Sequence, residues 1–161
     1  MNLFVLDKNP IKAAQLQCDK HIVKMIVESA QMLCTAHRML DGTFEKRLSN
    51  SGKRMVRYYR HRNPNIENTL YKAVHFNHPC TVWTRESMHN YRWHYKHFAA
   101  LCDEYTYRYG KVHKSVEVIN QLPLPQKMER LGFTTFGLAM PDESVSYTHL
   151  RAHETVLDLV C

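Results

Sequence analysis

The chain has 161 residues and a formal net charge of +7, with 44% hydrophobic and 23% charged residues. This composition is typical of a single globular domain with its own hydrophobic core. No apolar run approaches the roughly 18 to 20 residues that span a bilayer, and the first residues do not match a signal peptide. We therefore expect a cytoplasmic protein without a membrane partner, and the basic balance indicates an anionic ligand.

The first part of the chain predicts one strand followed by helix. Residues 2–6 form a short apolar run that is typical of a buried strand. Pro10 suits the first turn of a helix, and the helical pattern continues through residues 17–40. We expect either one long helix or two helices broken near Cys18.

The rest of the chain predicts a basic segment and further helices. Residues 41–66 hold glycine, serine and asparagine among many cations, and predict at most one short helix. Residues 67–76 predict another helix. Residues 79–109 contain no glycine or proline after Pro79, which predicts a second long helix. A shorter helix is expected at about residues 114–121.

These elements together predict the fold class. We expect a mainly α-helical, compact domain with two long helices and one short N-terminal strand, covering residues 1–143. Residues 144–161 resemble a translated sequencing-adapter tail. We therefore expect the natural chain to stop near Asp142 and the tail to be no part of a site.

A polar stripe follows one side of the apolar helix predicted at residues 17–40. At about 100° per residue, six polar side chains share one arc of about 100°. They are His21, Lys24, Glu28, Gln31, Thr35 and Arg38. The stripe is either the one solvated face of a mostly buried helix or the wall of a cleft that binds an anionic ligand. The mixture of residue types favours the cleft.

The second long helix predicts an opposite wall for this cleft. Its inward, aromatic face carries polar side chains that either satisfy main-chain groups or line the site. Across both helices, the predicted catalytic residues are Glu28, Lys24 and His21. The predicted ligand-binding residues are Lys20, Gln31, Arg38, Ser87, Asn90 and His94.

Two phrases of the sequence carry a resemblance to a family. They are CDKHxxKMxxExAQ at residues 18–31 and HPCxxWxRxSxxN at residues 78–90. With their flanking residues, up to about Pro141, they resemble a family of small uncharacterised proteins of tailed phages and some bacteria. The resemblance implies a phage-type setting and no particular activity.

Metal and cysteine chemistry have weaker signals. Cys18, His21, His75, His78 and Cys80 could supply a mixed set of zinc ligands, although their spacing is far from a paired CxxC motif. The cofactor therefore stays unknown, with zinc possible. Cys80 is the best-placed nucleophile because it lies in the first turn of a predicted helix.

Basic and aromatic residues alternate in two stretches, at residues 53–62 and 105–114. Tyrosines in such stretches can stack on bases while the cations hold phosphates, or they can pack into the core. The sequence leaves both possibilities open.

We therefore predict a phage-type protein that binds a nucleotide or a nucleic-acid segment in a cleft between the two long helices and acts on it. If it is an enzyme, the stripe suits a hydrolase, a lyase or a modifying enzyme. Two alternatives lack catalysis: a sponge that sequesters a nucleotide signal, and a general nucleic-acid-binding protein.

Overall fold

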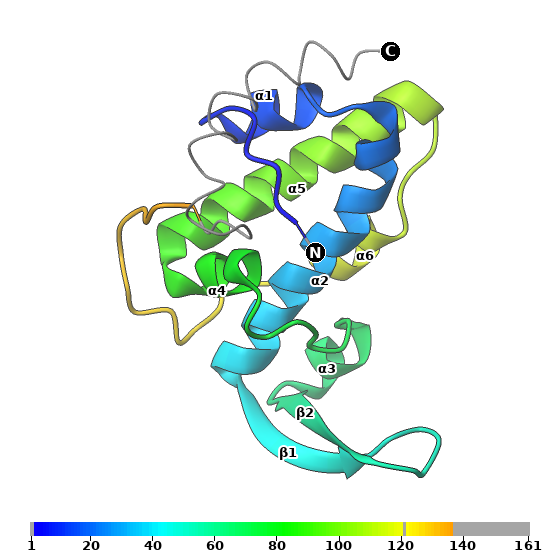
Figure 1. The fold of residues 1–161 in the computed structure, drawn as a ribbon, viewed down its shortest axis with the longest axis vertical. Helices are drawn as coiled ribbons and strands as arrows, with labels where there is room; N and C mark the ends of the chain where they lie inside the picture. Colours follow the sequence, from blue (N-terminus) through cyan, green and yellow to red (C-terminus); the bar gives the residue numbers. More distant parts are fainter. Residues whose placement is uncertain (1, 121, 137–161) are drawn as a thin grey trace, which may run out of the picture.

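The computed structural model describes residues 2–120 and 122–136, and Figure 1 shows how their elements are arranged. Within these residues there are six helices and a two-stranded antiparallel sheet. The helices pack into one body, and the hairpin formed by the two strands projects from one end of it (Figure 1). The predicted fold class, a helical domain with one N-terminal strand, is therefore wrong, because the architecture is mixed α/β. The predicted boundary at residue 143 and the tail at residues 144–161 lie outside the described residues.

The predicted N-terminal strand does not form. Residues 2–6 pair with neither strand of the sheet. Their apolar side chains do alternate, because Leu3 and Val5 pack near Trp83 whereas Phe4 packs against the main core. The alternation is that of a strand, but the segment lies on helices and has no strand beside it to pair with.

The first helical stretch is divided into α1 (Pro10–Gln15) and α2 (Asp19–Asp41). The side chain of Asn9 caps α1 by accepting two main-chain N–H bonds of its first turn. Cys18 is extended, with φ −71° and ψ 160°, at the start of α2. Of the two options that the sequence left open, the chain adopts two helices broken near Cys18, and α1 packs across α5.

The second long helix of the prediction is broken at Ser87 into α4 (Pro79–Glu86) and α5 (Met88–Tyr109). Ser87 is extended, with φ −147° and ψ 157°, and its hydroxyl oxygen accepts a hydrogen bond from the main-chain N of Asn90. Serine is a preferred N-cap residue, and this cap starts α5. Gly110 ends α5 in the left-handed region, with φ 64°.

The segment predicted to be irregular forms the sheet. Strands β1 (Gly42–Leu48) and β2 (Met55–His61) pair along their whole length, and β1 follows α2 directly. Helix α3 (Pro64–Thr69) comes next, whereas residues 70–76, predicted as helix, are irregular. Helix α6 (Ser115–Asn120) lies within the range predicted for the last helix.

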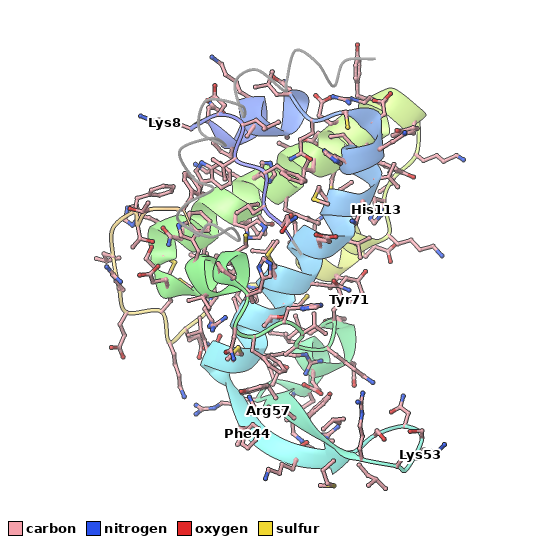
Figure 2. The ribbon with its side chains drawn as sticks, viewed as in Figure 1. Lys8, Phe44, Lys53, Arg57, Tyr71 and His113 are labelled. Carbon is pink, nitrogen blue, oxygen red and sulfur yellow. The ribbon has the colours of Figure 1, made fainter. Side chains whose placement is uncertain are left out.

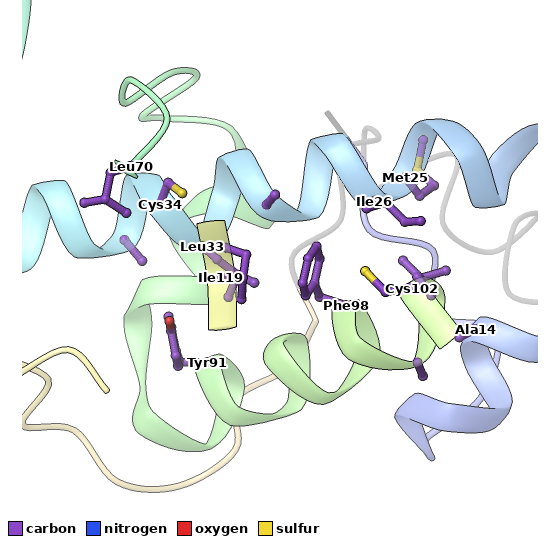
Figure 3. Packing of buried hydrophobic residues seen from close by; sticks show 14 of the residues in the cluster. Ala14, Met25, Ile26, Leu33, Cys34, Leu70, Tyr91, Phe98, Cys102 and Ile119 are labelled. Carbon is purple, nitrogen blue, oxygen red and sulfur yellow. The ribbon is translucent and has the colours of Figure 1, made fainter. Parts of the chain in front are cut away.

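The main hydrophobic core lies between α2 and α5 (Figure 3). Ile26 and Leu33 of α2 face Phe98 of α5, and Ile119 of α6 joins the same cluster. All four side chains are at most 2% exposed. Apolar side chains therefore occupy the space between the two helices where the sequence predicted a polar cleft.

Candidate nucleic-acid interface

The polar face of α2 supports two extended segments of the chain. The hydroxyl oxygen of Thr35 accepts a hydrogen bond from the main-chain N of Val74 at 3.1 Å. Toward the other end of α2, the carboxylate of Glu28 accepts one from the main-chain N of Asn2 at 2.8 Å. Extended segments outside a sheet need such partners, because their peptide groups have no neighbouring strand with which to form hydrogen bonds. Part of the stripe predicted to hold a ligand therefore binds the protein's own backbone.

Arg38 uses all its donors inside the protein. It is buried and donates to main-chain oxygens of Tyr59, Glu67, Leu70 and Tyr71 and to the Glu67 carboxylate, at 2.7 to 3.1 Å. A guanidinium has five N–H groups, so these five bonds leave no donor for an anionic ligand. This geometry corrects the predicted ligand role of Arg38. The side chain instead joins α2 to β2, to α3 and to residues 70–71.

The three predicted residues in the first two turns of α5 or just before them also have internal partners, although Nε2 of His94 has none among the described residues. Ser87 caps α5, and Asn90 donates to a main-chain oxygen of α4 and accepts from the main-chain N of Thr134 at 3.1 Å. His94 is fully buried, with its Nδ1 2.7 Å from the hydroxyl oxygen of Thr84. These partners belong to α4, to α5 itself and to residue 134, so a cleft with one polar wall on α2 and another on α5 does not form.

The other predicted residues lie along the exposed edge of α2. Lys20 and Lys24 are exposed, whereas His21, Glu28 and Gln31 are partly buried. Lys24 Nζ lies 3.5 Å from a carboxylate oxygen of Glu28. A lysine and a glutamate one turn apart stabilise a helix by only a few tenths of a kcal/mol. The catalytic and binding roles predicted for these five residues stay predictions.

The hairpin carries most of the net charge of the protein. Residues 42–62 contain seven lysines and arginines and one glutamate, a net +6 of the chain's +7 with histidine neutral. Figure 2 shows Lys53 at the tip of the hairpin and Phe44 and Arg57 on its strands. A projecting ribbon with this charge is suited to bind an anionic polymer by displacing its counterions.

The register divides the hairpin into two faces, because residues directly opposite each other in an antiparallel pair share a face. One face carries Phe44 opposite Tyr59 and Lys46 opposite Arg57. The rings of Phe44 and Tyr59 lie 5.5 Å apart, and Phe44 is 49% exposed. We name these four residues the basic-aromatic face.

The charges on the opposite face are paired. Glu45 forms ion pairs with Arg47 and with Arg60. On the basic-aromatic face, by contrast, neither Lys46 nor Arg57 has a carboxylate partner within the part of the chain that the structure describes. Two like charges directly opposite each other destabilise a strand pair. A bound anion would relieve this repulsion.

A groove adjoins the basic-aromatic face. It has a volume of about 540 Å³, and its walls include Arg54 and Arg57 of the hairpin and His75 and Phe76 of the irregular segment. The ring of Phe76 lies 5.4 Å from that of Tyr59. His75 has φ 49°, a left-handed conformation that is uncommon for a residue other than glycine. Backbone strain of this kind clusters at functional sites, which favours a role for the groove.

The second basic and aromatic stretch of the sequence differs from the hairpin. Arg108 donates to the carboxylates of Asp19 and Glu104 at 2.9 and 3.1 Å, and to the main-chain oxygens of Gln15 at the end of α1 and of Gln17. The rings of Tyr105 and Tyr109 pack 5.0 Å apart. The arginine of this stretch therefore has a structural role.

The cysteine and histidine side chains that could supply zinc ligands form no converged group of three within the residues that the structure describes. Within residues 2–120 and 122–136, one group of three ligand-type side chains converges elsewhere, at the base of the hairpin: His37, Asp41 and His61. Burial raises the pKa of the Cys34 thiol to about 12 and also raises that of Cys80. Both thiols are protonated at neutral pH and are poor nucleophiles.

No protein-family model, no curated protein and no solved structure matches this chain. None of the described helices combines the length and the hydropathy of a bilayer-spanning segment.

Proposed function

We propose that this protein binds nucleic acid through the basic-aromatic face of its hairpin and the groove beside that face. The observation that carries the proposal is the pair of opposed cations, Lys46 and Arg57, beside the exposed ring of Phe44. Unpaired cations bind phosphates, and exposed rings stack on bases. A two-stranded ribbon is also narrow enough to enter the major groove of a duplex.

The electrostatics of the hairpin support this function over a purely structural one. A solvated structural hairpin is stabilised by opposite charges across its strands, as Glu45 provides on the other face. On the basic-aromatic face, a phosphate backbone would convert the repulsion into charge-assisted hydrogen bonds. We also propose the phage-type setting and the cytoplasmic location that the sequence leads us to expect.

Fluorescence anisotropy with a labelled single strand and its duplex, measured at several salt concentrations, tests the proposal. Lys46→Gln and Arg57→Gln should each weaken binding and reduce the slope of log K against log salt by about 0.7 to 0.9. Phe44→Ala should weaken binding of the single strand by about 1–3 kcal/mol if this ring stacks on a base.

Two control variants remove the same charge elsewhere. Arg60→Gln acts on the opposite face of the hairpin, and Lys111→Gln removes an exposed cation after α5. Both should leave the salt slope nearly unchanged. If they reduce it as much as Lys46→Gln does, net charge and not the basic-aromatic face controls binding, and the proposal fails.

A second candidate function is turnover of the bound nucleic acid, with the catalytic role that the sequence predicts for Glu28. Burial lowers the pKa of His78, and the charges of His75 and Glu28 also act on this ring. His75 lines the groove and Glu28 does not, so Glu28 can serve as a base only on a ligand that extends beyond the groove toward His78. Glu28→Gln should then abolish cleavage of a labelled oligonucleotide without weakening its binding. A wild-type protein that binds without any turnover would support the non-catalytic alternatives.

A further inference from the structure

Three potential metal ligands meet where the hairpin joins α2. His37 and Asp41 lie one turn apart near the end of α2, and His61 is the last residue of β2. One ligand atom from each residue lies within 4.8 Å of the other two. His37 Nδ1 is 3.9 Å from Asp41 Oδ2, which is too long for a hydrogen bond. The nitrogen and the carboxylate therefore face each other without a direct bond.

His37 contributes a buried nitrogen that lacks a partner. Its side chain is fully buried, and Nδ1 has no hydrogen-bond partner in the part of the chain that the structure describes. The other ring nitrogen, Nε2, lies 2.7 Å from the hydroxyl oxygen of Tyr91. Buried polar atoms are nearly always satisfied, so a buried ring nitrogen without a partner requires an explanation.

Main-chain groups hold the other two side chains in place. The carboxylate of Asp41 accepts hydrogen bonds from the main-chain N of Gln126 and of Lys127, at 3.0 to 3.1 Å. Nδ1 of His61 lies 3.1 Å from the main-chain N of Asn63 and 3.4 Å from its oxygen, so residue 63 can partner either ring tautomer. Such outer bonds orient the ligands in metal sites.

We propose that His37, Asp41 and His61 bind a divalent transition-metal ion of the zinc type. Two imidazoles and one carboxylate suit zinc, whereas Mg²⁺ and Ca²⁺ prefer sites built from oxygen ligands. A tetrahedral ion with bonds of about 2.1 Å holds its ligand atoms about 3.4 Å apart. Because the three ligand atoms lie within 4.8 Å of one another, binding requires any two of them to approach by at most about 1.4 Å.

A metal ion at this position would connect the hairpin to the helical body. Asp41 immediately precedes β1, and His61 lies opposite the first residue of β1. An ion bound to both, and to His37 of α2, joins the base of the hairpin to the helical body. The metal site does not depend on nucleic-acid binding by the hairpin, and each can be measured without the other.

Titration of EDTA-treated full-length protein with Zn²⁺ alone tests the proposal. We expect one zinc per chain by elemental mass spectrometry after gel filtration, and a melting temperature that zinc raises and chelator restores. Asp41→Asn and His61→Gln should each weaken zinc binding by more than about 100-fold, and Tyr91→Phe should weaken it by about 10- to 100-fold through loss of an outer bond. His113→Gln, a partly buried histidine outside the group, should bind zinc as the wild type does.

Circular dichroism establishes which variants are folded before they are titrated. If the ligand variants do not fold, Tyr91→Phe decides, because it removes one hydroxyl and no ligand. Hydrogen exchange adds a second readout: zinc should slow exchange of the amides at residues 42–61. A wild-type protein that binds less than one equivalent of zinc overturns the proposal. So does equal zinc affinity in the folded variants and the wild type.

Discussion

Replacement of Arg38 by methionine removes the five hydrogen bonds that connect α2 to β2 and to the residues around α3. The side chain is 2% exposed and donates to four main-chain oxygens and to the carboxylate of Glu67. Methionine fills much of the same space but donates no hydrogen bond. All five acceptors would therefore lose a partner, and the Glu67 carboxylate would lose its cation.

The magnitude follows from the cost of breaking a buried ion pair on one side, which is about 3–5 kcal/mol. The side chain of Glu67 is 18% exposed and keeps two other donors, the hydroxyl of Tyr58 and the main-chain N of His61. These donors offset part of the loss, whereas the orphaned main-chain oxygens add to it. We expect a decrease of about 4 kcal/mol in the free energy of unfolding, a large share of the 5–15 kcal/mol typical of a domain.

Urea unfolding followed by circular dichroism measures this decrease as a lower midpoint at an unchanged m-value. Arg38→Lys should recover only part of the loss, because an ammonium group cannot reach acceptors spread over a planar fork. Lys24→Met is the matched control: it removes an exposed cation from the same helix and should change stability by less than about 0.5 kcal/mol. If Arg38→Met loses less than about 1 kcal/mol, the assigned structural role is refuted.

Two further predictions use the same unfolding assays. Gly42→Ala should lose about 1–3 kcal/mol, because an added Cβ would lie 2.2 Å from the main-chain oxygen of Arg38 and 2.9 Å from that of Arg60; wild-type stability in this variant would contradict the close approach. Burial lowers the pKa of His94 to about 3 and that of His97 to about 4, below the value near 6.5 of an exposed histidine. The unfolded chain therefore binds protons first as the pH falls below about 6.5, and each ring lowers stability by up to about 1.4 kcal/mol per pH unit until its folded-state pKa is reached. His97→Gln should make this decline shallower, and an unchanged slope would show that His97 does not contribute.

Features that depend on a residue's own conformational preferences could be predicted from the sequence. The possible break near Cys18 and the end of a helix at Gly110 are examples. The prediction failed where the outcome depends on a distant partner. At the break at Ser87 the side chain of Asn90 bonds to the main chain of Thr134, which is distant in the sequence, and residues 42–48 and 55–61 form strands because they pair with each other. Neither pairing leaves a helix-like or strand-like period in the sequence.

In the candidate sites, too, the sequence shows some of the residues, and only the fold brings them together. The seven cations of residues 42–62 are visible in the sequence, but only the strand register places Lys46 opposite Arg57 without a carboxylate between them. The pair His37 and Asp41 is visible as a helical i,i+4 spacing. The third ligand, His61, comes to them because the hairpin folds back onto the end of α2.

The sequence by itself determined that six polar side chains share one side of α2, because this follows from 3.6 residues per turn. Only the tertiary structure decided what those side chains face. Thr35 and Arg38 meet main-chain groups of residues 70–74, and Glu28 meets the main chain of Asn2. Helical spacing is a local property of the chain, whereas hydrogen-bond partners between distant segments are selected by the packing of the whole domain.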